Sequence, residues 1–571
     1  MTPHQLPADF LAAVRDWCDQ DPDAATRAEL EQLLTDASPA AEAALHDRFD
    51  TRLEFGTAGL RGAIGAGPNR MNRVLVAQAA TGFAAWLRGR ESTPSVVIGY
   101  DGRVNSRVFA TDTAELMAGA GLRAILLPRL LPTPVLAFAV RFFDASAGVM
   151  VTASHNPAAD NGYKVYLGGA DAGAQIVAPA DAEIAAEIHA IARGARVNEL
   201  ARSVDYETCD ESVVDEYVRA TAALAGEVAA RYPAVKFAYT ALHGVGWQTA
   251  SRVFAAAGFG APTSVIEQQE PDAAFPTVAF PNPEEPGALD AAFAAATAAG
   301  SALIIANDPD ADRLAVAIPL RASAAPPAPA GGQTAWRRLT GNEVGALLGW
   351  RAAERAAASQ PRGALAASLV SSPALAAVAR HYGLDFVETL TGFKWISRTP
   401  HLVFGFEEAL GYLVDPEKIR DKDGISAAVD ILSLATELAA VGQNLDDRLL
   451  DFAERFGGYA SAQLSLRVTR LTEITDVMAR LRTASPTMIG SLAVDRVDDF
   501  SVGFGRYPAS DILRFWLVDG SRVIVRPSGT EPKVKVYLDA VVSVGSASER
   551  LAAASAIVSE LEGSIRTLLA P

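Results

Sequence analysis

The sequence predicts an α/β protein of about four domains, the last of which is a smaller α+β domain. Three observations carry this prediction. The chain has 571 residues, and a domain usually takes roughly 150. With 50% hydrophobic and 20% charged residues, the composition is that of a globular protein. Short apolar runs alternate with alanine-rich helical stretches through most of the chain.

The alternation begins with the apolar run Val96–Tyr100, which predicts a strand, and continues with a helical stretch from Phe109 to Ala120. Because β–α–β units lay helices across parallel strands, this rhythm predicts largely parallel sheets covered by helices. Further strands are expected at Ala124–Leu127, Ala147–Val151, Lys236–Thr240, Ser264–Ile266, Leu303–Ile305 and Ala364–Val370.

Two stretches divide the chain. Residues Arg321–Thr334 are rich in Pro, Ala and Gly and form either a domain boundary or an inserted surface loop. Residues Phe456–Gly458 precede Leu464–Val468, which alternates as a half-buried strand does. The first 45 residues are expected to be a helical extension. The predicted domains are 1–207, 208–325, 326–452 and 453–571.

Charge and cysteine content exclude several classes of protein. The net charge is −17 and the pI near 5.0, which argues against binding to nucleic acid or to an anionic membrane. Cys18 and Cys209 are the only cysteines, so neither a disulfide framework nor a cysteine zinc site is expected. The first residues do not have the pattern of a secretory signal. A soluble cytoplasmic protein is therefore expected.

The loop Thr152–Pro157, TASHNP, directly follows an expected strand. It presents Ser154 at the carboxyl end of that strand, where open α/β sheets bind ligands. Ser154 is a candidate nucleophile or phosphate carrier, and a turn capped by Ser and Asn is the alternative. Lys164, in the sequence NGYK just downstream, is a cation that could return to the same site.

The loop Asp308–Arg313, DPDADR, lies between two apolar runs. Asp308, Asp310 and Asp312 repel one another unless a cation joins them, and carboxylate oxygens select Mg²⁺, Mn²⁺ or Ca²⁺. The pattern does not favour an EF-hand, because the sixth position of the motif would be Arg313 instead of Gly and the twelfth Pro319 instead of Glu. An acidic surface turn is the alternative, made less attractive by the buried strands expected on both sides.

Three further loops carry polar groups suited to binding hydroxyl or phosphate groups. Glu407 and Glu408, in GFEEALGY, can accept hydroxyl hydrogen bonds, and TGFKW lies just upstream. The loop RPSGTEPK, Arg526–Lys533, offers hydroxyls, backbone N–H groups and two cations, as a phosphate cradle would. Arg61, in FGTAGLRG, is a third candidate for phosphate. Each loop also has a purely structural interpretation: GFEEALGY as a helix start, RPSGTEPK as a hairpin tip and FGTAGLRG as a flexible loop.

Taken together, these motifs resemble the α-D-phosphohexomutase superfamily of phosphoglucomutases, phosphomannomutases and phosphopentomutases. The resemblance spans roughly residues 50 to 540 and follows the order of the family. FGTAGLRG, TGFKW and GFEEALGY are similar to its phosphopentomutase-like branch. The resemblance implies an α/β fold with four domains around a central cleft, three of them similar and the C-terminal one α+β and mobile.

The resemblance also implies a role for individual residues. Ser154 would be the phosphoserine, and Asp308, Asp310 and Asp312 would hold Mg²⁺ with it. The reacting centre would be lined by Arg61, His155, Lys164, Arg313, Lys394 and Lys422. Glu407, with Gly392 and Lys394 of TGFKW, would bind the sugar, and the non-reacting phosphate would be held by Arg526, Ser528, Gly529 and Thr530. Ala409 stands where many members have Ser, so one sugar contact is missing.

The implied reaction moves phosphate between C1 and C6 of glucose or mannose phosphate through a phosphoserine and a sugar bisphosphate. One Mg²⁺ and an activator such as glucose 1,6-bisphosphate are expected. Lys164 is the candidate general base and acid, because burial beside other cations lowers the pKa of a lysine, and His155 is the rival. The alternatives are a phosphopentomutase, a phosphosugar phosphatase and a non-catalytic sugar-phosphate sensor. The expected partner is a small sugar phosphate, and the expected state is a monomer or homodimer.

Overall fold

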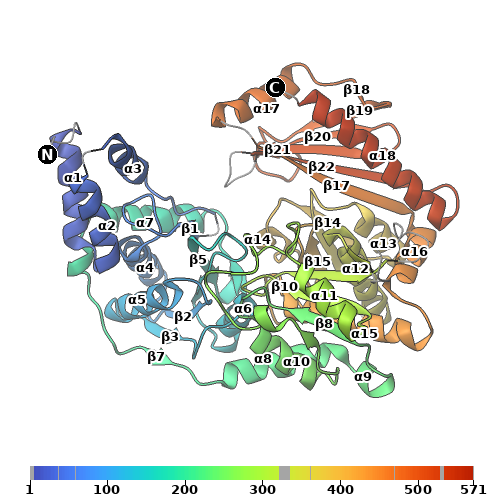
Figure 1. Ribbon diagram of the computed structural model, residues 1–571, viewed down its shortest axis with the longest axis horizontal. Helices are drawn as coiled ribbons and strands as arrows, with labels where there is room; N and C mark the ends of the chain where they lie inside the picture. Colours follow the sequence, from blue (N-terminus) through green and yellow to red (C-terminus); the bar gives the residue numbers. More distant parts are fainter. Residues whose placement is uncertain are drawn as a thin grey trace. The chain divides into compact units, whose positions relative to one another are not determined.

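The computed structural model describes residues 6–36, 38–57, 59–320, 335–359, 362–467, 470–527 and 533–569. The chain divides into two compact units. The first is formed by Met1–Leu339 with Gly411–Thr436, and the second by Thr340–Leu410 with Glu437–Pro571. Four sheets with their helices make up the described part of the chain (Figure 1), which confirms the predicted α/β class.

Three helices precede the first sheet, as expected for the N-terminal extension: α1 (Ala8–Gln20), α2 (Ala24–Thr35) and α3 (Pro39–Phe49). Ser38 begins α3 by accepting a hydrogen bond from the N–H of Ala41, and Pro39 takes the first helical position. Leu30 and Leu45 are fully buried and pack into the core of the first sheet. The extension is therefore part of the first unit.

The first sheet has the order β1-β5-β4-β2-β3-β7, with β6 paired to β5. The pairings of β2 with β3 and β4, and of β3 with β7, are parallel, whereas β5 runs antiparallel to β1, β4 and β6. Its strands are β1 (Gly59–Ala63), β2 (Ser95–Tyr100), β3 (Arg123–Leu126), β4 (Ala147–Val151), β5 (Asp160–Leu167), β6 (Ala174–Gln175) and β7 (Glu207–Thr208).

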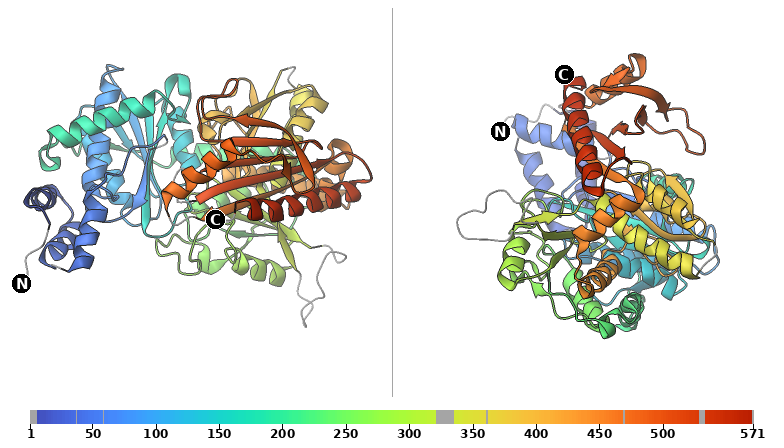
Figure 2. Two further views of the ribbon diagram at one scale, coloured as in Figure 1. Left: turned by 90° about the horizontal axis from the view of Figure 1, so that it is seen from above. Right: turned by 90° about the vertical axis from the view of Figure 1, so that its right-hand side faces the viewer.

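Helices cover both faces of this sheet (Figure 2). Val96 and Ile98 of β2 belong to the same core as α4 and α5, while Gly99 faces Leu136 of α6. Because both faces are buried, β2 and β4 are continuous apolar runs instead of alternating ones. The helices are α4 (Arg73–Arg88), α5 (Ser106–Gly119), α6 (Thr133–Phe142) and α7 (Ala180–Gly194).

The second sheet has the order β12-β11-β10-β8-β9. The strand expected at Ser264–Ile266 is wrong in part, because the strand ends at Ser264 and Ile266 begins a 3₁₀ turn. Buried Gln268 holds that turn by accepting the hydroxyl of Thr240. The Pro-rich segment Arg321–Thr334 lies outside the described residues. The strands are β8 (Phe237–Thr240), β9 (Thr263–Ser264), β10 (Leu303–Asn307), β11 (Leu314–Pro319) and β12 (Trp336–Arg338).

Further helices of the first unit lie in this part of the chain. They are α8 (Ser212–Ala222), α9 (Val228–Arg231), α10 (Gly246–Ala256) and α11 (Asp290–Ala299). Helix α11 packs against β8, β9 and β10. A later segment returns to the first unit with β16 (Gly411–Leu413) and the start of α15 (Gly424–Ala440). This returning segment contains Lys422, one of the predicted site residues.

The second unit begins with a parallel arrangement in which β13 (Ala364–Ser368) lies between β14 (Asp385–Thr389) and β15 (Leu402–Glu407). Its helices are α12 (Gly341–Ser359), α13 (Ala374–Tyr382), α14 (Phe393–Ile396) and α16 (Leu445–Phe456). Asn444 and Asp447 form a reciprocal capping box at the start of α16. The third α/β domain is thus built as the alternation predicts.

The last sheet is antiparallel, with the order β17-β22-β21-β20-β19-β18, which confirms the predicted α+β character of the C-terminal part. It is formed by β17 (Gly458–Arg467), β18 (Met488–Ile489), β19 (Leu492–Asp499), β20 (Leu513–Leu517), β21 (Arg522–Pro527) and β22 (Lys533–Val542), with α17 (Leu471–Thr483) and α18 (Ala547–Leu568). Among the described residues no single helix is long and apolar enough to cross a membrane, and only α15 and α16 taken together reach that length and composition.

Candidate active site

The acidic loop Asp308–Arg313 connects two buried neighbouring strands, β10 and β11. Asp308, Asp310 and Asp312 are fully buried, and one carboxylate oxygen from each lies within 4.8 Å of the others. Ala311 has φ 55°, a left-handed turn that bends the loop so that the three side chains converge. The alternative of an acidic surface turn is therefore wrong.

Ser154 lies beside this acidic loop. It follows β4, and its hydroxyl donates a hydrogen bond of 2.7 Å to Oδ2 of Asp308. Its backbone has φ 52°, and its N–H donates to Oγ1 of Thr152 at 2.8 Å. The carboxyl ends of β4 and β10 thus bring together two motifs that are 154 residues apart in the chain.

Two lysines lie among the carboxylates, Lys164 buried and Lys422 largely so. Nζ of Lys164, on β5, is 2.7 Å from Oδ2 of Asp310 and 2.9 Å from Oδ2 of Asp312. Nζ of Lys422 is 2.8 Å from Oδ2 of Asp312. The expectation of a lowered pKa for Lys164 is wrong in this structure. Burial acts in that direction, but Asp310 and Asp312 outweigh it and raise the pKa above its ordinary value.

His155 and two arginines complete the cluster. Nδ1 of His155 is 3.1 Å from Oγ of Ser154. Burial, together with the charges of Arg313 and Arg61, holds the pKa of His155 well below its ordinary value, so the imidazole is neutral. Arg61 of β1 donates to Oδ1 of Asn156 at 3.2 Å, and Nε of Arg313 is 3.9 Å from Oδ2 of Asp308.

These oxygen atoms suit a hard divalent cation. Oδ1 of Asp310 and Oδ1 of Asp312 are buried and accept no hydrogen bond from the described residues. Burial and the charges of Asp310 and Asp312 raise the pKa of Asp308 well above its ordinary value. A cation would relieve both the unsatisfied oxygens and the repulsion between carboxylates. The donor set of three carboxylates and the Ser154 hydroxyl therefore fits such a metal.

The predicted sugar- and phosphate-binding residues lie in the second unit. Oε1 of Glu407, at the end of β15, accepts a hydrogen bond of 2.6 Å from the N–H of Gly392. Nζ of Lys394 lies 5.8 Å from the ring centre of Trp395. Nη1 of Arg526 donates to Oγ1 of Thr391 at 2.8 Å. The TGFKW segment thus contacts both Glu407 and Arg526, while Ser528, Gly529 and Thr530 lie outside the described residues.

Sequence reasoning missed several residues that hold the site. Thr133 donates from its hydroxyl to Oδ2 of Asp310 at 2.6 Å. Oε2 of Glu408 accepts the hydroxyls of Ser368 and Ser371, so the two adjacent glutamates have different partners. Arg103 donates to several carbonyls of the Ser154 loop. The sequence around Arg103, an Asp-Gly-Arg after an apolar strand, was the one available signal.

Comparison with known proteins places all four domains in one family. Models of the phosphoglucomutase/phosphomannomutase family match in chain order. The α/β/α domain I matches residues 52–194, domain II residues 215–320, domain III residues 340–456 and the C-terminal domain residues 466–555.

Individual relatives agree with these matches. The chain is 54% identical over 470 residues to a Haemophilus influenzae protein named probable phosphomannomutase, covering 82% of this chain and 93% of that one. It is 34% identical to the human phosphopentomutase, covering 92% and 90%. A phosphoglucomutase/phosphomannomutase family protein from Burkholderia thailandensis has the same fold, with a TM-score of 0.65 and 20% identity over 91% of this chain and 98% of that one. The chain belongs to the phosphoglucomutase/phosphomannomutase family of isomerases, which transfer a phosphoryl group within a sugar phosphate.

Proposed function

We propose that this protein moves a phosphoryl group between C1 and C6 of a hexose, converting glucose or mannose 1-phosphate to the 6-phosphate through phosphorylated Ser154 and a bisphosphorylated sugar. The observation that carries the proposal is the hydroxyl of Ser154, 2.7 Å from Asp308 in a cluster that also holds Lys164 and Lys422. These lysines would offset part of the charge of a phosphoryl group carried by Ser154. Identity of 54% to the protein named probable phosphomannomutase supports a hexose substrate.

In this mechanism the bond from phosphorus to Oγ of Ser154 breaks as a bond to a sugar hydroxyl oxygen forms. The hydroxyl proton passes to a base, and the reverse transfer from the other end of the sugar restores phosphoserine. We assign proton transfer at Ser154 to His155, because Nδ1 lies 3.1 Å from Oγ. Lys164, whose ammonium contacts two carboxylates, would neutralise charge together with Arg61 and Arg313.

We assign the metal position to Asp308, Asp310, Asp312 and the oxygen of Ser154, with Mg²⁺ as the expected ion. When bound, this ion would neutralise charge on the transferring phosphoryl group. A sugar bisphosphate such as glucose 1,6-bisphosphate would prime Ser154. These oxygen ligands suit Mg²⁺ because hard cations prefer carboxylate oxygens.

We assign sugar recognition to the second unit. Glu407 would accept sugar hydroxyls, with Gly392 and Lys394 as further contacts. We also assign Lys422 of the first unit, which lies beside Asp312, to substrate binding. Arg526, with Ser528, Gly529 and Thr530, would hold the phosphate that does not react. The hydrogen bond between Arg526 and Thr391 supports this grouping, because it joins the proposed phosphate and sugar loops. We also propose that the four domains of the chain meet near residues 207, 325 and 453.

A phosphopentomutase is the second candidate, supported by the human relative of that name. Ala409 offers no hydroxyl to a sugar, so one contact that could distinguish a hexose is missing. Comparing kcat/KM for glucose, mannose, ribose and deoxyribose phosphates decides between them. A preference of tenfold or more for the pentose phosphates, about 1.4 kcal/mol, would replace the hexose assignment.

The function itself is tested with Ser154→Ala. We expect the variant to lose nearly all mutase activity, to take up no phosphate from glucose 1,6-bisphosphate, and still to bind sugar phosphate. Intact-protein mass spectrometry measures the phosphate, and calorimetry measures the binding. More than a few per cent residual activity would contradict the role of Ser154. Steady release of inorganic phosphate by the wild type would indicate a phosphatase, and binding without phosphorylation would indicate a sensor.

A further inference from the structure

One buried arginine, outside the predicted site, contacts the whole loop that carries Ser154. Arg103 follows β2, and its side chain is 1% exposed. Its Nη2 donates to the carbonyl oxygens of Ser154 and Asn156, both at 2.6 Å. Its Nη1 donates to the carbonyl oxygens of Pro157 and Asp160, at 2.8 and 3.1 Å. One guanidinium therefore satisfies four acceptors in the stretch from Ser154 to the first residue of β5.

The conformation of Ser154 explains why such a contact is needed. A φ of 52° is unfavourable for a residue other than Gly, at a cost of roughly 1–2 kcal/mol. The N–H of Ser154 is held by Thr152, and its carbonyl oxygen by Arg103. Both peptide groups that flank this side chain are thus fixed. The hydroxyl then points toward Asp308 instead of sampling other directions.

Arg103 is itself held in place. Oδ1 of Asp101 accepts from the N–H of Arg103 and from the hydroxyl of Ser106, and Oδ2 lies 3.5 Å from Nε of Arg103. The ring of Phe275, from the second domain, has its centre 5.0 Å from the guanidinium carbon. Carbonyl oxygens, a carboxylate and an aromatic ring therefore surround the guanidinium, and the side chain is closed to solvent at 1% exposure.

We propose that Arg103 is a positioning residue, which holds Ser154 in the conformation that exchanges phosphate without touching the sugar. The proposal rests on Ser154 being the phosphate carrier. A guanidinium has five N–H donors in a planar fork and can serve four acceptors at once. An ammonium has three donors on one atom, so lysine keeps the charge of Arg103 but not its geometry.

The test compares Arg103→Lys with Arg107→Lys. Arg107 is the second residue of α5 and is exposed. For Arg103→Lys we expect kcat with glucose 1-phosphate and glucose 1,6-bisphosphate to fall by about 100-fold, because small displacements of a reacting group cost about this much. KM should change by less than about threefold, because Arg103 does not contact substrate. Phosphorylation of Ser154, followed by mass spectrometry, should slow by the same factor as kcat.

A second readout does not depend on activity. In the enzyme without added metal, hydrogen exchange of the backbone amides between residues 152 and 160 should be faster in Arg103→Lys than in the wild type and in Arg107→Lys. Exchange of the C-terminal sheet should be the same in all three. Unchanged kcat and unchanged exchange in Arg103→Lys would overturn the proposal, as would a rise in KM that matches the loss of kcat.

If Arg103→Lys does not fold, Arg103→Gly with added guanidinium chloride at millimolar concentration replaces it. Saturable recovery of Ser154 phosphorylation by guanidinium, without recovery by ammonium, supports the proposal. A folded variant that shows no recovery contradicts it. Failure of the wild type to phosphorylate Ser154 would instead contradict the proposed function, so the two failures are distinguishable.

Discussion

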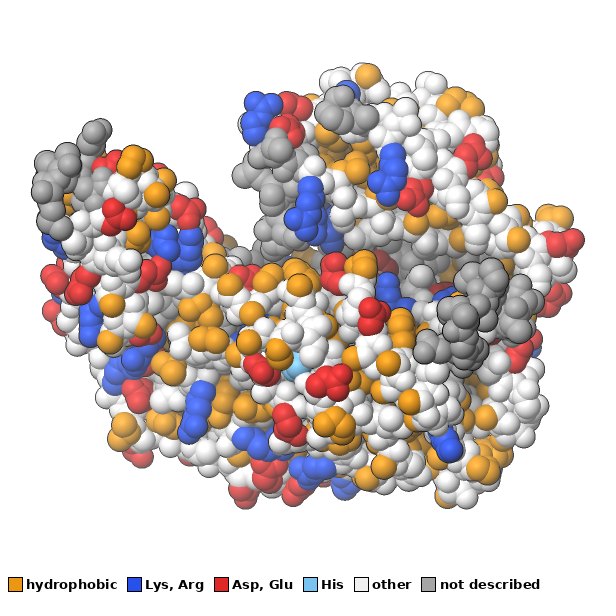
Figure 3. Space-filling view, in the orientation of Figure 1, with side chains coloured by type: hydrophobic (Ala, Val, Ile, Leu, Met, Phe, Trp, Pro, Cys, Tyr) orange, Lys and Arg blue, Asp and Glu red, His pale blue; other side chains and the backbone are white. Residues whose placement is uncertain are grey.

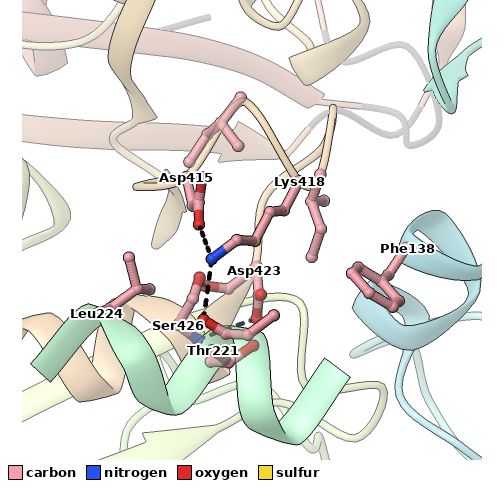
Figure 4. Close-up of a pocket in the computed structure, with 10 residues that line it drawn as sticks. Phe138, Thr221, Leu224, Asp415, Lys418, Asp423 and Ser426 are labelled. Atoms are coloured by element: carbon pink, nitrogen blue, oxygen red, sulfur yellow. Dashed lines mark hydrogen bonds and ion pairs between the residues drawn. The ribbon is translucent and has the colours of Figure 1, made fainter. Parts of the chain in front are cut away.

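Two buried tyrosines hold the residues on either side of Lys422. The hydroxyl of Tyr166 donates to Oδ2 of Asp421, and that of Tyr217 lies 3.0 Å from both carboxylate oxygens of Asp423. Figure 4 shows the small pocket that Asp423 lines, with Lys418 between Asp415 and α8. These contacts fix the segment whose Lys422 reaches Asp312, so a small number of buried polar groups determines where a cation of the site lies.

The carboxyl group of Asp423 gives a prediction about pH. Burial raises the pKa of Asp423 to about 6, from an ordinary value of 3.8. Between these values the folded protein binds a proton that the unfolded chain has lost, so this group makes stability fall as pH rises from about 4 to 6, by up to a few kcal/mol. Asp423→Asn removes this pH-dependent contribution to stability, because an amide does not titrate. We expect the melting temperature of the variant, relative to wild type, to increase across that window and to stay level above it.

Parallel melting curves would contradict this prediction. Both proteins are compared in the same buffers by differential scanning fluorimetry, so that other titrating groups contribute equally. The amide oxygen of Asn can still accept the N–H bonds of Ile425 and Ser426 that begin α15, and the capped helix start should survive the change.

The loop that connects β8 to α10 packs directly against the acidic loop Asp308–Arg313. Leu242 and His243 both have positive φ, at 48° and 59°, and the N–H of Val245 donates to the carbonyl oxygen of Pro309 at 2.8 Å. A side chain at Gly244 would place its Cβ 2.2 Å from Cα of Pro309. The two loops therefore approach as closely as their backbones allow, and this contact requires Gly.

Gly244→Ala should displace the acidic loop. We expect a loss of stability of about 1–3 kcal/mol, as for other overpacked sites. The affinity for Mg²⁺ should fall about tenfold or more, because changes to the groups that position metal ligands usually weaken metal binding by at least this factor. Gly260→Ala is the matched control, since a Cβ there meets nothing within 4 Å. Thermal unfolding and calorimetric titration with Mg²⁺ measure the two effects, and equal results for both variants would contradict the steric argument.

The whole chain carries a net charge of −17, yet its proposed substrate is an anion. On the face drawn in Figure 3, acidic and basic side chains of the described residues are mixed, with no single basic area. The cations of the site are buried instead: Lys164 and Lys422 are 9% and 12% exposed. Recognition of phosphate then depends on short-range contacts in a site shielded from salt and from the overall field.

Sequence reasoning predicted the meeting of Ser154 with the acidic loop only through the resemblance of the combined motifs to a known family, because β4 and β10 belong to different sheets and their ends do not share an edge. It did not predict Arg103, Thr133 or Thr391. Their partners lie 51, 177 and 135 residues away, and a single polar residue in a loop does not indicate a distant partner. The predicted lowering of the pKa of Lys164 is wrong for the same reason, because the two carboxylates that raise this pKa come from another domain.

In the second unit, the carboxylate of Glu388 in the third domain contacts two arginines of the fourth domain. Oε1 of Glu388, on β14, accepts from Nη1 of Arg514 at 2.6 Å, and Oε2 accepts from Nη1 of Arg522 at 3.2 Å. Phe500 and Ile512 of the last domain pack with Leu369 and Val370 beside this contact. The side chain of Arg522 is 1% exposed, so it depends on its protein partners for compensation of its charge.

Glu388→Gln should therefore weaken the junction between these two domains. Two buried arginines lose an anionic partner, and we expect a cost of about 2–3 kcal/mol, below the usual value for a fully buried pair because Glu388 is 21% exposed. Glu562→Gln, which breaks the exposed Glu562–Arg566 pair on α18, should cost less than about 0.5 kcal/mol. Thermal unfolding and limited proteolysis of the full chain measure both. If the two variants unfold and are cleaved alike, then the apolar contacts around Phe500 hold the domains together without Glu388.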